Sequence, residues 1–133
     1  MRSMSEEEVR LSRALVRHPR WEWRHGMVVC RDCAPHLRDF LWRELTFTGK
    51  RDLEFIDDGS IPDLTSASTL GAILGLIREL HQDRDMHPVL VDGSWCWRDG
   101  RGLALPLRYA PSYAASLYCG LDTTLTPKEA ERE

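Results

Sequence analysis

The segment from Ile61 to Leu80 constrains the fold of this chain more than any other. A polar turn over residues 63–68 leads directly into the most strongly apolar segment with helical periodicity. Its apolar residues recur at the i, i+3, i+4 and i+7 positions that form one face of a helix, namely Leu70, Ile73, Leu74, Ile77 and Leu80. With Thr65 as the N-cap, this pattern predicts a buried central helix over residues 65–80.

The same segment carries small residues at i, i+4 and i+8, namely Ala67, Gly71 and Gly75. An interior glycine costs a helix about 1 kcal/mol relative to alanine. Because close approach of another backbone usually offsets such a cost, we expect a neighbouring element to pack closely against Gly71 and Gly75.

The elements before the central helix are predicted from local signals. Ser5-Glu6-Glu7-Glu8 is a capping box and predicts a helix from residue 6 to residue 16 or 17, ended by Pro19. Alternation predicts a strand over 21–24, a turn at His25-Gly26 and a strand over 27–30. For the stretch that follows, either a short helix starts at residues 34–35 or a strand covers 43–48. We favour the strand, with a return strand over 53–56 and a loop over 57–60.

After the central helix, short strands are expected over residues 89–91, 94–98 and 103–105. Asp92-Gly93 is a strong hairpin signal between the first two. Residues 113–119 predict a terminal helix that ends at Gly120 as a left-handed cap. The pattern W-x-W-R-x-G occurs at residues 21–26 and again at 95–100, which predicts two similar hairpins.

This order of elements predicts an α+β fold. We expect an antiparallel, hairpin-built sheet packed against the central buried helix, with an N-terminal and a C-terminal helix. A chain of 133 residues has the size of one domain. The predicted domain covers residues 1–121, and residues 122–133 are expected to form a polar, flexible tail.

Composition excludes several classes of protein. The net charge of −3 argues against nucleic acid as the main partner, since such binding usually rests on a basic surface. No apolar run approaches the roughly 18 residues of a membrane span, and the N-terminus lacks the apolar region of a secretory signal. No P-loop, G-x-G-x-x-G, G-x-S-x-G or H-E-x-x-H pattern is present, so we predict neither a cofactor nor enzymatic activity.

A zinc site is the main alternative. Cys30 and Cys33 have the C-x2-C spacing of a zinc knuckle, and His36 could be a third ligand. A fourth ligand would come from Cys96, Cys119, His25 or His81. There is no second C-x2-C pair, so we expect the four cysteines to be structural thiols.

The five tryptophans are the best candidates for contacts with a partner. Trp, Tyr and Arg dominate the binding energy of protein interfaces. The candidate partner-binding residues are those tryptophans that have arginine neighbours and few apolar neighbours, together with these arginines: Trp42, Arg43, Trp95, Trp97, Arg98 and Arg101.

The chain also resembles a family of small phage and prophage proteins. The family pattern is W-x-W, then G-M, then P-D-L-T-D-P-A-T-x-G and an apolar helix. Trp21-Glu22-Trp23, Gly26-Met27 and Pro62-Asp63-Leu64-Thr65 match it, whereas Ser66-Ala67 stands in place of Asp-Pro. The resemblance covers about the first two thirds of the chain and brings no activity with it.

This resemblance implies a non-enzymatic phage or mobile-element accessory protein in the cytoplasm of the bacterial host. Its partner would be another protein. Because the resembled family comes from phages and prophages, its source suggests that this protein inhibits a host or defence component, such as a CRISPR effector.

Overall fold

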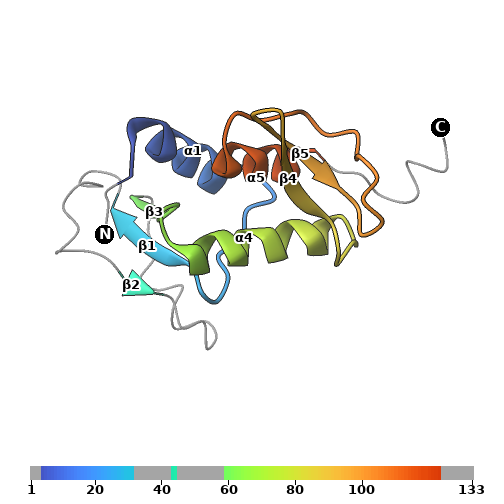
Figure 1. Ribbon diagram of the computed structural model, residues 1–133. Coiled ribbons are helices and arrows are strands. Elements are labelled where there is room, and N and C mark those ends of the chain that lie inside the picture. The colour runs from blue at the N-terminus through green and yellow to red at the C-terminus, as the bar shows by residue number, and fades with distance from the viewer. Residues whose placement is uncertain (1–3, 32–42, 45–58, 124–133) are drawn as a thin grey trace. The chain divides into compact units, whose positions relative to one another are not determined.

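The computed structural model describes residues 4–31, 43–44 and 59–123. Within these residues the chain forms three helices and two small antiparallel sheets, so the α+β prediction is confirmed (Figure 1). Two sheets are present in place of the single sheet that the sequence predicts. The chain divides into two compact units, residues 1–73 and residues 74–133. The single domain over residues 1–121 stays a prediction.

Helix α1 (Glu6–Arg17) begins at the predicted capping box. Ser5 Oγ accepts a hydrogen bond from the Glu8 amide at 3.1 Å, and the Glu8 carboxylate accepts one from the Ser5 amide at 2.9 Å. These bonds satisfy two backbone donors that would otherwise be left unpaired at the helix start. The helix ends two residues before Pro19, as expected.

The first sheet consists of β2 (Arg43–Glu44), β1 (Val28–Arg31) and β3 (Ser60–Pro62) in that order, with both pairs antiparallel. Figure 1 shows β1 between its two partners. The buried Ser12 hydroxyl of α1 donates to the Pro62 carbonyl at 2.5 Å, which holds α1 against β3.

Some predictions around this sheet fall on residues that the structure does not describe. Of the predicted strand over 43–48, only Arg43 and Glu44 lie within the described residues, and they form β2. The predicted strand over 53–56 and the alternative helix near residues 34–41 lie outside them. Ser60, predicted as part of a loop, begins β3.

Residues 21–24 form no strand, so that prediction is wrong. The Trp21 amide donates to the His18 carbonyl at 3.0 Å, and the turn after α1 therefore uses an amide that strand pairing would need. The rings of Trp21 and Trp23 meet edge to face, with centroids 5.3 Å apart. The predicted turn before β1 is present, with Gly26 at φ +94°. Only the second W-x-W segment belongs to a hairpin.

Helix α4 (Ala67–Leu80) begins at Ala67 rather than at residue 65. Asp63 explains the shift, because its Oδ1 accepts hydrogen bonds from the Thr65 amide at 2.9 Å and from the Thr65 hydroxyl at 2.6 Å. Thr65 therefore belongs to the preceding turn. Ser66 takes the capping role, with its Oγ accepting from the Thr69 amide at 3.4 Å.

The buried face of α4 differs from the predicted one. Its fully buried side chains are Thr69, Ile73, Leu76 and Ile77. Leu70 and Leu74 are only half-buried, so the prediction is wrong for these two residues. Thr69 Oγ1 accepts a hydrogen bond from the Val28 amide at 2.8 Å, and this polar contact with β1 places Thr69 in the interior.

Gly71 and Gly75 are exposed, and the predicted close backbone approach is wrong. A Cβ atom built at either position meets no described atom within 4 Å. Both glycines therefore carry a helix-propensity cost of about 1 kcal/mol without a gain from packing.

The second sheet is a hairpin of β4 (His87–Val91) and β5 (Ser94–Arg98). Its turn is Asp92-Gly93, as predicted. These residues have φ values of 50° and 80°, which suit the two-residue turn favoured by this dipeptide.

The predicted strand over 103–105 is wrong. The segment after β5 forms two isolated bridges with it in place of a continuous ladder, between Arg98 and Ala104 and between Trp95 and Ala110. The Leu103 amide donates to the Asp99 side chain at 2.9 Å instead of to a strand.

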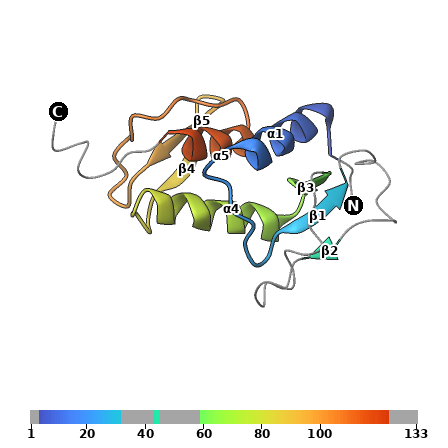
Figure 2. The same ribbon diagram turned by 180° about the vertical axis from the view of Figure 1, so that it is seen from behind.

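Helix α5 (Tyr113–Asp122) packs against this hairpin (Figure 2). Ser112 caps it, with its Oγ accepting from the Ala115 amide at 3.1 Å. The fully buried Trp97 of β5 donates from its indole nitrogen to the Ser116 carbonyl of α5 at 2.8 Å.

Gly120 lies inside α5 rather than at a left-handed cap, so that prediction is also wrong. Its carbonyl lies 2.7 Å from Nε2 of the buried His81. A Cβ atom at this position would lie 2.6 Å from the Trp97 ring, and this close contact explains the glycine. The helix continues through the fully buried Leu121 to Asp122. Residues 124–133 of the predicted tail lie outside the described residues.

Candidate functional site

The structure separates the tryptophans and arginines that the sequence groups as partner contacts. Trp97 is completely buried and is a core residue, so it offers no surface to a partner. Trp95 is half-buried and meets Tyr113 edge to face, with ring centroids 5.1 Å apart. Trp42 lies outside the described residues, and Arg43 belongs to β2.

Arg98 precedes, and Arg101 lies within, a loop that is ordered by one carboxylate. We call residues 99–103 the Asp99 loop. Asp99 Oδ1 accepts hydrogen bonds from the amides of Arg101 and Leu103, both at 2.9 Å. The Asp99 amide donates to the Leu103 carbonyl at 2.9 Å, and the Asp99 carbonyl accepts from the Gly102 amide at 3.0 Å. These bonds close the loop on itself.

Two further contacts connect the Asp99 loop to its surroundings. The Arg98 guanidinium donates to the Gly102 carbonyl at 3.0 Å. A Cβ atom at Gly100 would lie 2.6 Å from Cβ of Asp85, so the loop packs directly on the turn before β4. The backbone of the Asp99 loop is thus ordered before any partner binds.

The pKa of Asp99 agrees with a carboxylate that orders the loop. Its hydrogen bond from the Leu103 amide lowers the pKa of the Asp99 carboxyl, and the amide and the charge of Arg101 act in the same direction. Partial desolvation opposes the shift. The ionised form of Asp99 is therefore the one that orders the loop.

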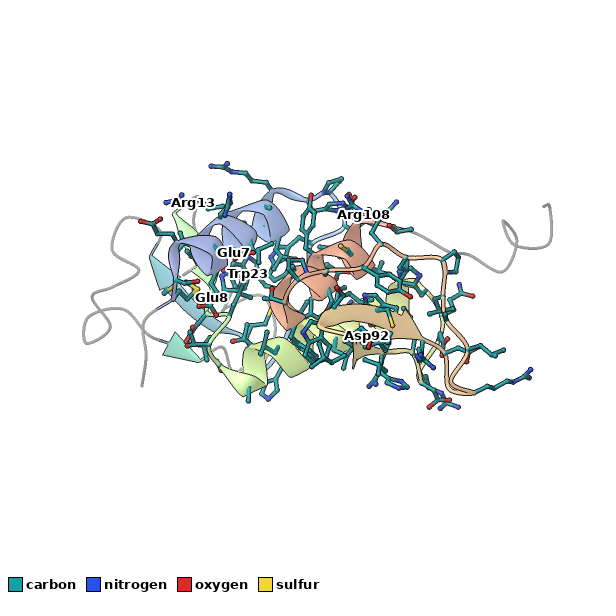
Figure 3. All side chains as sticks on the ribbon, turned by 45° about the horizontal axis from the view of Figure 1, so that its top comes forward. Glu7, Glu8, Arg13, Trp23, Asp92 and Arg108 are labelled. Atoms are coloured by element: carbon teal, nitrogen blue, oxygen red, sulfur yellow. The ribbon has the colours of Figure 1, made fainter. Side chains whose placement is uncertain are left out.

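The Asp99 loop presents a large apolar side chain to solvent. Leu103 is 62% exposed, and Tyr109, on the segment that returns along β5, is 63% exposed. Two exposed arginines, Arg101 and Arg108, lie close to these residues in the sequence, and Figure 3 labels Arg108. Arg108 forms an ion pair with Asp122 at 3.2 Å. The sequence pattern did not single out Leu103 or Tyr109, because Leu103 falls in the predicted strand over 103–105 and Tyr109 falls in no predicted element.

The zinc hypothesis names Cys30, Cys33 and His36 as ligands. Cys30 is buried in β1, and Cys33 and His36 lie outside the described residues. Within the described ranges, no three His, Cys, Asp or Glu side chains are placed to hold a metal ion. Cys96 and Cys119 are buried thiols, and burial raises the pKa of Cys119.

Comparison with models of protein families, with curated proteins and with solved structures finds no match. Among residues 4–31, 43–44 and 59–123, every helix falls short of the length and apolarity that crossing a membrane requires.

Proposed function

We propose that this chain is a non-enzymatic accessory protein of a phage or other mobile element that binds another protein in the cytoplasm of the bacterial host. The proposed contact surface is the Asp99 loop, which carries the exposed side chains of Arg101 and Leu103. The resemblance of the first part of the chain to small phage proteins supports the source.

The observation that carries the binding proposal is the exposure of Leu103 on an ordered loop. A large apolar side chain in water is unfavourable for the isolated protein, and its burial in an interface recovers that free energy. Because the Asp99 carboxylate already orders the loop, binding loses little conformational entropy. Arg101 supplies a guanidinium that suits an acidic or polar rim on the partner.

The proposed class of partner is a protein of the host, and inhibition of a defence component such as a CRISPR effector is the outcome that the phage analogy favours. The net charge of −3 supports a protein partner over nucleic acid.

The test is affinity capture from host lysate with mass spectrometry, using the wild-type chain and three variants. Leu103→Asp and Arg101→Glu change the proposed surface. Arg10→Glu, on the exposed face of α1, makes the same change of charge elsewhere. Circular dichroism confirms that all variants are folded.

We expect one stoichiometric protein with the wild type and with Arg10→Glu. Its affinity should fall by about tenfold or more in Leu103→Asp, as for the loss of an interface hot spot. The proposal would be contradicted if no stoichiometric protein were captured. It would also be contradicted if Leu103→Asp and Arg101→Glu captured the protein as well as the wild type does.

A further inference from the structure

At Leu90 of strand β4, both the backbone amide and the backbone carbonyl face away from the hairpin. The amide and the carbonyl of Trp95 both bond to Ala110, at 2.9 Å or less. Trp95 and its partner Leu90 are therefore a pair without mutual hydrogen bonds, and the Leu90 amide and carbonyl point to the outer edge of β4. Neither group has a hydrogen-bond partner among the described residues, and the Leu90 side chain is 55% exposed.

Pro88 and Met86 precede Leu90 at alternate positions, so their backbone groups face the same outer edge, but neither residue offers a free amide hydrogen there. Pro88 has no amide hydrogen to donate. At Met86, the amide donates to Asp83 Oδ1 at 3.1 Å, and the carbonyl accepts from Arg78 Nε at 2.8 Å. Leu90 is thus the residue of β4 at which both an outward donor and an outward acceptor are open.

We propose that β4 pairs with β4 of a second copy of this chain, antiparallel, around a twofold axis at Leu90. In an antiparallel sheet, a hydrogen-bonded pair of residues exchanges both N–H···O=C bonds. Leu90 of each copy can therefore donate to, and accept from, Leu90 of the other. Beyond Leu90, any partner strand meets Pro88 and Met86, which offer no open donor, so the pairing is confined to Leu90 and needs no partner strand longer than β4 itself. A pairing centred on one residue is self-complementary, as a twofold interface requires.

Charges on the hairpin agree with this register. The pairing places Asp92 opposite the uncharged Pro88 of the second copy, so no two like charges lie directly across from each other (Figure 3 labels Asp92). The two copies of Asp92 are four residues apart along the ladder, which is about 14 Å at the usual rise of a strand. That separation exceeds the screening length in physiological salt, so like charges do not oppose the pairing.

Self-pairing of β4 is separate from the proposed function. It involves the outer edge of β4, whereas the segment after the Asp99 loop lies along β5. Testing it needs only the purified chain. Sedimentation velocity should show a monomer that converts to a dimer as the concentration rises. Leu90→Pro, which removes the outward amide at a position equivalent to Pro88, should abolish the dimer. Leu90→Ala keeps the amide and should weaken the dimer less.

Amide exchange measured by NMR on the wild-type chain keeps the inference testable if Leu90→Pro does not fold. The Leu90 amide should exchange as an unprotected amide in dilute solution and gain about tenfold protection or more at high concentration. Val89 and Val91 are the matched controls, because their amides bond within the hairpin at every concentration. A chain that stays monomeric, a dimer that leaves the Leu90 amide unprotected, or protection independent of concentration would each overturn the inference.

Discussion

Gly120→Ala should destabilise the protein although it places a better helix former inside a helix. The built Cβ atom lies 2.6 Å from Cζ2 and 3.0 Å from Cε2 of Trp97, and 3.1 Å from Cγ2 of Ile77. Contacts below 3.0 Å require a neighbour to move. Trp97 cannot move freely, because it is fully buried and its indole nitrogen is bonded to the Ser116 carbonyl one turn earlier on the same helix.

The magnitude follows from two opposing effects. Replacing glycine by alanine in a helix stabilises it by about 1 kcal/mol. Overpacking a filled interior costs about 1–3 kcal/mol, and the rigid ring of Trp97 places this site at the upper end. The expected net loss in the free energy of unfolding is therefore about 2 kcal/mol.

Urea denaturation followed by circular dichroism measures this loss. Gly75→Ala is the matched control, since it makes the same change in a helix where no atom of the described residues lies within 4 Å of the added methyl group. It should stabilise the protein by about 0.5–1 kcal/mol. If Gly120→Ala proves as stable as Gly75→Ala, the close packing of α5 against Trp97 is wrong.

Three further predictions concern other parts of the chain. Ser12→Ala should lower the free energy of unfolding by about 1–3 kcal/mol in urea, because it leaves the Pro62 carbonyl without its buried donor; an unchanged midpoint would contradict this. Ile77→Ala should cost about 2–5 kcal/mol in the same assay, and Leu74→Ala clearly less, because only Ile77 is fully buried; equal losses would refute the burial pattern. Acid should loosen the Asp99 loop: since folding lowers the pKa of Asp99, the order of the loop is complete above the unfolded-state pKa and is lost as the pH falls through the folded-state pKa. Amide exchange of residues 99–103 as a function of pH measures this. The loop amides of Asp99→Asn should exchange rapidly at every pH. If neither acid nor Asp99→Asn changed the exchange of these amides, the carboxylate would not order the loop.

Features that depend on near neighbours in the chain are predicted well from the sequence. The capping box at Ser5 and Glu8, the turn at Gly26 and the hairpin turn at Asp92-Gly93 all form as expected. Each rests on bonds or backbone angles within a few residues, so local chemistry is sufficient to specify them. The α+β class follows from the same local signals.

The residues of the candidate site were predicted less well, because their exposure depends on distant parts of the chain. The sequence pattern treats Trp95 and Trp97 alike, yet only Trp97 is fully buried, with its indole nitrogen bonded to α5. It named Arg101 but missed Leu103, because the carboxylate of Asp99 captures the amide that the predicted strand would have used. Which aromatic side chain is buried depends on a helix that follows much later in the chain.

Local signals in the sequence were enough to predict where α1 and α5 begin, where the hairpin turns and that helices and strands are mixed. Contacts between distant parts of the chain set the pairing of β1 with β2 and β3 and the burial of Thr69. Such contacts also make Gly120 tightly packed, whereas no described atom lies within 4 Å of a Cβ at Gly75. The physical reason is the range of the forces involved. Caps and turns are closed by bonds between residues a few positions apart, whereas strand partners and the space around a glycine are set by residues that only folding brings together.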